Sequence, residues 1–304
     1  MDRFGAMQVF VAVAETGSFA GAARRLGQSP PAVTRAVAAI EQRIGIPLLL
    51  RTTRSVRLTE AGARYLGDCR RILADIEEAE WAAAGAHAEP RGQIAITAPV
   101  MFGRMHVAPV VDAFLDRHPL VTARLVLLDR VTDLMEEGFH VAVRIAELGD
   151  SGLHAQRVGS VRPVICATPT YLERHGEPRQ PEDIAAHTAI ISSPQATLRE
   201  WGLLRDGREV RIVPSAQLQV NAADVAIEAV LNDRGLTRLL SYQVAPLVRA
   251  GRLRIILADY EPPQIPVHLV HLEGRRVSAR VRAFIDFAAG YLRNDLNTVE
   301  KSLY

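Results

Sequence analysis

Between residues 18 and 43 the apolar residues recur at helical spacing in two runs, which are separated by a short polar turn. The first run forms one apolar face from Phe19, Ala22, Ala23 and Leu26. The second run recurs at intervals of four, three and four residues, as in a helix that buries a single stripe made of Val33, Val37, Ile40 and Ile44. The spacing therefore predicts two short helices that meet at a tight turn.

The ends of these two helices are marked by residues suited to helix termini. Ser18 and Ser29 stand at the predicted N-caps, Gly27 lies in the turn, and Pro30 takes a first helical position, where its missing N–H costs nothing. The face opposite the stripe is small, polar and singly basic, with Pro31, Thr34, Arg35, Ala38 and Gln42. Such a helix enters a DNA major groove without bringing carboxylates against phosphates. An ordinary helical hairpin within a core is the alternative that the spacing leaves open.

A basic segment follows the predicted helix pair. The run RTTRSVRLT carries Arg51, Arg54 and Arg57 among β-branched residues and no acidic residue, which suits a two-stranded wing that places guanidinium groups beside phosphates. Residues 1–60 hold eight arginines and four carboxylates, whereas the whole chain has a net charge of +2, so the positive charge is concentrated at one end. Another helix, from about residue 3 to 15, is expected to pack on the pair through Phe4, Met7, Phe10, Val11 and Ala14.

A long helix is predicted from Glu60 to about His87, with Thr59 as its N-cap. Its apolar positions recur alternately after four and three residues, which gives a heptad seam of Tyr65, Cys69, Ile72, Ile76, Ala79 and Ala83. The other positions are rich in charge, so a partner helix would bury this seam, and we expect a homodimer through this helix. Packing of the stripe on its own domain is the alternative.

Residues 86–92 contain Pro90 and Gly92 between a helix and a strand and mark a domain boundary. From Gln93 onward, strand-like and helical runs alternate, which is typical of an α/β fold with a central, largely parallel sheet. The first half is predicted to hold strands in ITAP, TARLVLL and HVAVRI, a helix near residues 103–117 and a short helix ending at Gly138.

The second half begins near Pro163. Its predicted strands are VICATP, GLTRLL and residues 189–191, 210–213, 217–220 and 253–257, and its helices are residues 171–175, 222–232 and 242–250. A return strand, VHLVHL, and an amphipathic helix over residues 277–292 come last, and we expect them to rejoin the first half. Two lobes linked by two crossovers follow from this order. The segment from Asn294 onward predicts no structure.

Composition and motifs exclude several classes of protein. No uninterrupted apolar run of 18 residues occurs and the N-terminus is unlike a secretory signal, so no membrane segment is expected. Cys69 and Cys166 lie far apart, which argues against a disulfide framework or a cysteine metal site and fits a reducing cytosol. The nine histidines show no metal-ligand spacing, and GxSxG, GxGxxG and phosphate-loop motifs are missing. We therefore expect no metal, no cofactor and no enzymatic activity.

The stretch VAETGSFAGAARRLGQSPPAVTRAVAAIEQRIGIPLLLRTTRSVRLTEAG resembles the N-terminal module of the LysR-type transcriptional regulators. The resemblance runs without a gap from Phe4 to about Ala88, and more weakly through most of the remaining chain. Pro30 stands where the family usually has a Gln that often contacts a base, and Leu49 replaces a usual Phe. The resemblance implies an N-terminal all-α winged helix-turn-helix, a long linker helix, and a C-terminal α/β two-lobed effector domain similar to periplasmic binding proteins.

Two sets of candidate site residues follow. The predicted DNA-binding residues are Ser18, Ser29, Pro30, Pro31, Ala32, Thr34, Arg35, Arg51, Arg54 and Arg57, with the turn, Thr34 and Arg35 facing bases and the last three arginines facing the backbone. The resemblance places an effector site where Thr97, Ala98 and Pro99 run into Phe102 and Gly103, a helix start whose amides suit a carboxylate. Further candidates at strand ends are Arg144, Cys166, Thr168, Ser192, Ser193, Asn221 and Arg238. Each of these alone is more often a surface or capping residue, and for Cys166 a thiol redox switch is a further alternative.

These observations predict a cytoplasmic, sequence-specific DNA-binding regulator whose operator binding a small-molecule effector modulates from the cleft of the C-terminal domain. Residues 1–59 would form the winged helix-turn-helix, residues 60–89 the dimerisation helix and hinge, and residues 90–304 the effector domain. Lobe 1 would comprise about 92–162 and 267–293, and lobe 2 about 163–266. Paired dimers would form a homotetramer on double-stranded DNA. The alternative is a solute-binding or enzymatic α/β protein with an N-terminal dimerisation module. The sequence does not specify the effector, the operator or the direction of regulation.

Overall fold

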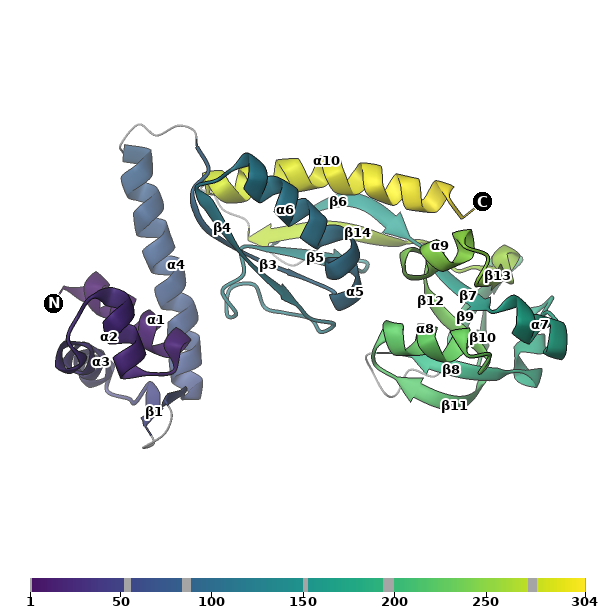
Figure 1. The fold of residues 1–304 in the computed structure, drawn as a ribbon, viewed down its shortest axis with the longest axis horizontal. Coiled ribbons are helices and arrows are strands. Elements are labelled where there is room, and N and C mark those ends of the chain that lie inside the picture. Colours follow the sequence, from purple (N-terminus) through teal and green to yellow (C-terminus); the bar gives the residue numbers. More distant parts are fainter. Residues whose placement is uncertain are drawn as a thin grey trace. The chain divides into compact units, whose positions relative to one another are not determined.

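The computed structural model describes residues 2–51, 56–83, 89–149, 153–193, 200–272 and 278–303. The chain forms two compact units, which are described separately below (Figure 1). Unit 1 comprises Met1–Glu89 and Thr132–His140, and unit 2 comprises Pro90–Val131 and Val141–Tyr304. Within the described ranges, no helix is both long enough and apolar enough to span a bilayer.

Three short helices build the core of unit 1: α1 (Arg3–Thr16), α2 (Phe19–Leu26) and α3 (Pro30–Ile44). Each of them ends at a glycine in the left-handed region, Gly17, Gly27 and Gly45, with φ angles of 59°, 62° and 83°. Only glycine adopts this conformation without a steric cost, which is why the helices stop there. The predicted helix pair and the helix before it are confirmed.

The buried faces differ in part from the predicted stripes. In α1, Phe4 is 48% exposed, whereas Ala6, Val9 and Val13 are buried. The prediction of a single stripe for this helix is wrong because α1 packs against α2, α3 and α4 and therefore buries a wider face. In α3 the expected stripe is buried except for Ile44, the last helical residue, which is 38% exposed.

The predicted wing is a two-stranded antiparallel hairpin of β1 (Leu49–Arg51) and β2 (Val56–Leu58). The carboxylate of Glu41 on α3 accepts the backbone N–H groups of Leu48 and Leu49, at 2.8 and 3.1 Å. Leu49 is buried at 4% exposure, so it fills a core position as expected of the replacement for a Phe. The wing is thus attached to the helix that precedes it.

Helix α4 (Glu60–Ala83) starts where predicted, and the hydroxyl of Thr59 accepts the N–H of Gly62 at 2.9 Å. The same hydroxyl lies 3.0 Å from the carbonyl of Pro47 and 3.2 Å from that of Leu48. At Gly62 the helix passes so close to the wing that an added Cβ would lie 1.9 Å from the Leu48 carbonyl oxygen. Helix and wing are therefore in direct backbone contact.

The first turns of α4 do not form a free seam. Cys69 is fully buried within unit 1, and Tyr65 and Ile72 pack partly buried against the same core. The Phe10 and Tyr65 rings are 5.4 Å apart. The alternative of packing on the chain's own domain therefore holds for this part of the predicted seam, because α1 occupies it. Ile76 is half-buried, and the side chains of Ala79 and Ala83 lie outside the described residues.

Lobe 1 of unit 2 is a five-stranded mixed sheet in the order β4-β3-β5-β14-β6. Its strands are β3 (Gly92–Ala98), β4 (Val121–Leu127), β5 (Val141–Ile145), β6 (Leu153–Val161) and β14 (Ile265–Leu272). Helix α5 (Val100–Phe102), a π-helical turn over Gly103–Val107 and α6 (Ala108–Arg117) connect β3 to β4, and α10 (Ala279–Lys301) lies beside α6 over the sheet (Figure 1). One apolar core joins these helices to the strands.

Lobe 2 is a second five-stranded mixed sheet in the order β11-β8-β12-β7-β13, with a separate hairpin of β9 and β10. Its strands are β7 (Pro163–Ala167), β8 (Thr188–Ser192), β9 (Trp201–Arg205), β10 (Arg208–Ile212), β11 (Ser215–Val220), β12 (Leu236–Leu240) and β13 (Arg254–Ile256). Its helices are α7 (Pro169–His175), α8 (Ala223–Leu231) and α9 (Ser241–Arg249), with 3-10 turns at Pro181–Ala186 and Ala258–Tyr260.

The chain crosses between the lobes twice, after β6 and before β14, and β14 and α10 return to lobe 1 as predicted. Five details differ from the prediction. Residues 134–138 form turns rather than a helix, and strands β6 and β9 were not predicted. Helix α10 continues nine residues beyond residue 292, because Leu296 and Val299 pack on the lobe 1 core. Both sheets contain antiparallel as well as parallel pairs, so neither is largely parallel.

Candidate functional sites

The caps of the helix pair hold α2 and α3 in place. The hydroxyl of Ser18 accepts the N–H of Gly21 at 3.2 Å, and that of Ser29 accepts the N–H of Ala32 at 3.4 Å. Ser18 is half-buried, so its local role in the fold is to cap α2. Ser29 and Pro30 are exposed at the start of α3. The beginning of α3 is therefore open to solvent.

The outer face of α3 is open as the sequence predicts. Pro31, Arg35, Ala38 and Gln42 are exposed, and Ala32 and Thr34 are half-buried. The Thr34 hydroxyl donates to the Pro30 carbonyl at 3.0 Å, which leaves its oxygen as an acceptor. Pro30 and Pro31 have no side-chain hydrogen-bonding group. Arg35 is the charged donor among the residues of this face.

Gln28 is an exposed residue of the turn that the predicted set omits. It lies directly before the Ser29 cap, and its amide is both a donor and an acceptor, the combination that reads adenine edges. The signal was available in the sequence, since a Gln stands two residues before the Pro30 that replaces the family's usual Gln.

The wing places one predicted arginine on its exposed face. Arg57 is exposed and lies opposite Leu50, which is 55% exposed. Arg51 ends β1, and its side chain lies outside the described residues, as does Arg54 entirely.

Two other arginines of unit 1 have a structural partner. Glu15 pairs with Arg25 of α2 at 2.7 Å and with Arg70 of α4 at 2.9 Å. Burial alone would raise the pKa of Glu15, but the hydrogen bonds from both arginines outweigh it and lower that pKa below its ordinary value. These pairs hold α1, α2 and α4 together, so Arg25 and Arg70 are already neutralised.

The first part of the candidate effector site lies at the end of β3. Thr97 and Ala98 are buried, at 3% and 2% exposure, and Pro99 is half-buried. Phe102 is fully buried in the lobe 1 core, 5.1 Å from the ring of Tyr242. At Gly103 an added Cβ would collide with the Leu127 side chain, so this glycine serves close packing.

The helix start that was expected to hold a carboxylate already has one from the chain itself. The N–H of Val100 donates to the carboxylate of Asp129, which follows β4, at 2.9 Å. A ligand carboxylate at the first amide of α5 would have to compete with this bond.

The strand directions of lobe 2 divide the remaining candidates into two groups. Strands β8 and β11 run parallel, so Ser192, Ser193 and Asn221 follow strand ends at the same edge of the sheet. Strand β7 runs antiparallel to β12, which is itself parallel to β8. Cys166 and Thr168, near the end of β7, therefore lie toward the opposite edge, and the expectation that they occupy an analogous strand end is wrong.

Local contacts account for these two residues. Thr168 caps α7 by accepting the N–H of Tyr171 at 3.1 Å, and its hydroxyl donates to Asp233. Cys166 is fully buried, and burial raises the pKa of its thiol to about 12. Because the thiolate is the reactive species, this environment does not support a redox switch at Cys166.

Arg144 and Arg238 are the charged members of the candidate set. Arg144 lies on β5 next to His268 of β14, one residue before the end of the strand. Arg238 lies in the middle of β12, where its Nη1 donates to the carbonyl of Gly202 at 3.2 Å. Burial lowers the pKa of the Arg238 guanidinium.

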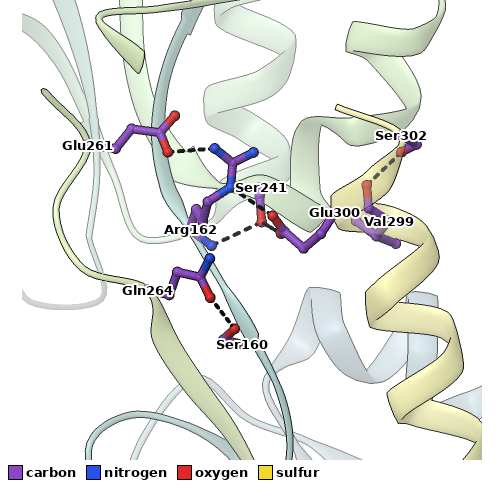
Figure 2. Close-up of polar contacts among 8 residues, drawn as sticks. All are labelled: Ser160, Arg162, Ser241, Glu261, Gln264, Val299, Glu300 and Ser302. Carbon is purple, nitrogen blue, oxygen red and sulfur yellow. Dashed lines mark hydrogen bonds and ion pairs between the residues drawn. The ribbon is translucent and has the colours of Figure 1, made fainter. Parts of the chain in front are cut away.

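A cluster of polar residues lies where the chain crosses between the lobes (Figure 2). Arg162, only 6% exposed, donates from Nη1 to Glu261 at 2.6 Å and from Nε to Glu300 at 2.7 Å. The hydroxyl of Ser241 donates to Glu300 at 2.5 Å and accepts the N–H of Arg162 at 3.1 Å. The cluster thus ties both crossovers to the first residue of α9 and to the last turn of α10.

An aromatic contact adds a second connection between the lobes. Tyr242 of α9 is 2% exposed and belongs to the lobe 1 core, with its ring 5.3 Å from that of His106. The Nδ1 atom of His106 lies 2.6 Å from the carboxylate of Asp295 on α10.

Within the described part of the chain, no group of three or more side chains is arranged to ligate a metal ion.

An open α3 face beside a basic wing, together with a two-lobed α/β domain, defines a DNA-binding transcriptional regulator with an effector-binding domain. Residues 4–63 match the family model described as bacterial regulatory helix-turn-helix protein, lysR family. Residues 87–293 match the model described as LysR substrate binding domain. The chain belongs to the LysR-type transcriptional regulators.

Relatives of known name agree with this assignment. The chain is 36% identical over 291 residues to an HTH-type transcriptional regulator of Xanthomonas campestris pv. campestris (strain 8004), covering 94% of this chain and 85% of that protein. It is 31% identical over 292 residues to CrgA of Neisseria meningitidis serogroup B (strain MC58), covering 95% and 97%. The protein is accordingly a regulator rather than an enzyme, and the alternative of a solute-binding or enzymatic protein is not supported.

Solved structures show the same architecture. A CrgA structure from Neisseria meningitidis aligns with a TM-score of 0.62 at 30% identity, covering 95% of this chain and 98% of the other. Full-length LysG from Corynebacterium glutamicum, solved with bound effector Arg, aligns with a TM-score of 0.62 at 22% identity, covering 96% and 99%. The predicted fold class, a winged helix-turn-helix with a linker helix and a two-lobed α/β domain, is confirmed.

Proposed function

We propose that α3 reads base edges in the major groove and that the wing contacts the DNA backbone. The observation that carries this proposal is the exposed outer face of α3, on which Arg35 is the charged donor beside Thr34 and the exposed Ser29 to Ala32 turn. Arg51, Arg54 and Arg57 are assigned to phosphates. Gln28 joins the base-facing set, because it is exposed directly before α3.

Helix α4 is proposed as the dimerisation helix, through its part beyond Ile72. The first turns pack on α1, and Ile76, which is half-buried, is the next position of the predicted seam. Two-fold pairing presents two α3 helices to two half-sites. Pairing of dimers into a tetramer and a cytoplasmic location complete the proposal, with residues 1–59, 60–89 and 90–304 as the three functional parts.

The effector is proposed to bind at the edges of the two sheets that carry Ala98 and Ser192. Both are strand ends, and ligands of α/β domains bind at such ends. Thr97, Pro99, Arg144, Ser193 and Asn221 lie at or next to the same edges. Thr168 and Cys166 are left out of this site because of the direction of β7.

Fluorescence anisotropy with genomic fragments selected by the full-length protein tests the DNA assignment. Arg57→Ala should weaken binding to all fragments and reduce the slope of log affinity against log salt by about one. Arg35→Ala should cost about 1–3 kcal/mol and relax the preference at particular base pairs. Arg252→Ala, at an exposed arginine of lobe 2, is the matched control and should change neither quantity. An unchanged salt slope for Arg57→Ala would contradict the wing assignment.

A further inference from the structure

Arg238 is a charged residue in the middle strand of the lobe 2 sheet. Strand β12 has β8 on one side and β7 on the other, and Arg238 pairs across with Ile165 of β7. Middle strands of α/β sheets are normally apolar, because both of their faces are covered. The guanidinium lies on the face that the β9–β10 hairpin covers, where it reaches the Gly202 carbonyl of β9.

Within the described part of the chain, that carbonyl is the only hydrogen-bond partner of Arg238, and no carboxylate forms an ion pair with it. A guanidinium has five N–H donors, and one neutral acceptor leaves its charge without compensation. The buried Arg162 shows how the same domain stabilises an arginine that has a structural role, with Glu261 and Glu300 both in contact. Arg238 is half-buried, and withdrawing a charge from water without a counter-ion is costly, so a role in folding does not account for it.

The position of Arg238 along β12 brings it near the predicted effector edge. Side chains two residues apart on a strand share a face, so Leu236, Arg238 and Leu240 point the same way. Leu236 is buried beside Trp201 and Leu203 of the hairpin, whereas Leu240 packs against the lobe 1 core. Arg238 therefore lies two residues, about 7 Å along the strand, from Leu240, which contacts lobe 1. The end of β12 is at the same edge as Ser192, because β12 and β8 are parallel.

We propose that Arg238 is the anion-binding residue of the effector site and that the effector carries a carboxylate. This inference rests on the proposed effector-binding function and names its ligand class. A carboxylate matches the planar fork of a guanidinium and balances its single charge. At the first amide of α5 an anion would have to displace Asp129, whereas Arg238 has no carboxylate to displace.

Thermal unfolding of the full-length protein with matched ligand pairs tests the proposal. The probes are acetate, benzoate, pyruvate and succinate, each compared with its neutral amide at equal ionic strength, with sodium phosphate as a separate arm. At least one carboxylate should raise Tm in a saturable way, and its amide should not. Arg238→Met should raise the apparent Kd for that carboxylate at least about tenfold, and Arg238→Lys should raise it less. Arg252→Met is the control and should leave the Kd unchanged.

Several results would overturn the proposal: a carboxylate shift that survives Arg238→Met, equal shifts from amide and acid, a response to phosphate alone, or no saturable response to any of the four acids. If Arg238→Met does not fold, Arg238→Lys and Arg238→Gln carry the same comparison. DNA binding is measured on the same samples. Sequence-preferring DNA binding without an Arg238-dependent carboxylate response defeats this inference alone, whereas loss of sequence preference in the parent protein defeats the proposed function.

Discussion

Arg162 and Arg238 lie in the same two-lobed domain, the first buried and the second half-buried, but they have different kinds of partner. Arg162 bonds to two carboxylates that come from the second crossover and from the last turn of α10 (Figure 2). Arg238 bonds to one backbone carbonyl. The charge of Arg162 is neutralised by carboxylates of the fold, whereas the charge of Arg238 is left for a ligand to neutralise. Matching substitutions at the two positions test this distinction.

The largest expected effect is that of Arg162→Met. This change removes the buried cation between the half-buried Glu261 and Glu300, and breaking a buried pair costs about 3–5 kcal/mol. Urea unfolding is followed by tryptophan fluorescence in a Trp81→Phe background, so that the signal comes from Trp201 in lobe 2. A loss below about 1 kcal/mol, the range of an exposed pair, would show that the cluster does not hold the lobes together.

Glu300→Gln should have the next largest effect. The amide keeps the shape of the side chain but removes the charge that Arg162 and Ser241 both contact, at an expected cost of about 1–3 kcal/mol. The same Trp201 signal measures it. Glu173→Gln on α7, an exposed carboxylate, is the matched control and should be neutral. Equal effects of the two changes would place Glu300 among ordinary surface residues.

The pH dependence should distinguish Glu261 from Glu15. Burial and the neighbouring Glu300 raise the pKa of Glu261 despite Arg162, so its stabilising contribution is present below its ordinary pKa of 4.5 and is lost as the pH rises through the raised value. The stability of the parent protein relative to Glu261→Gln should therefore fall with rising pH in that window. For Glu15, whose pKa is lowered, the parent should gain on Glu15→Gln as the pH rises from the lowered value to 4.5. Trends of the same sign for both would contradict these environments.

The smallest effect on stability is expected for Arg238→Met. Replacing a half-buried cation that has no counter-ion by an apolar side chain of similar length should change the unfolding free energy by less than about 1 kcal/mol, or increase it. The measurement is again the Trp201 transition, now set beside Arg162→Met. A loss as large as that of Arg162→Met would mean that Arg238 has a structural role, and the comparison would fail.

Helix ends and the wing were predictable from the sequence because their signals are local. Ser18, Ser29 and Thr59 all cap the helices that they precede, and the glycines at the helix ends adopt positive φ. The hairpin of β9 and β10 also had a local signal that was missed. Its turn is Asp206-Gly207, both at positive φ, which is the preferred pair for a two-residue hairpin.

Features that depend on distant contacts were not predictable in this way. Strand β6 lies at the edge of its sheet and has only two buried residues, so it lacks the apolar alternation of a buried strand. The direction of β7 determines which edge Thr168 occupies, and no residue pattern within β7 records it. The last turns of α10 are polar in sequence and are fixed by Leu296 in the lobe 1 core and by Glu300 at the crossover. The predicted seam of α4 also packs in part on α1, since Cys69 lies in the same core as the α1 residues, and the heptad spacing does not show this.

The close approach of Gly62 to Leu48 has a mechanical consequence. The backbones of Gly62 and Leu48 are in contact, and the Thr59 hydroxyl bonds both the Pro47 carbonyl and the Gly62 N–H, so α4 and the hairpin are closely joined. A tilt of the first turns of α4 is therefore passed to Leu48, the residue before β1, and through it to the wing.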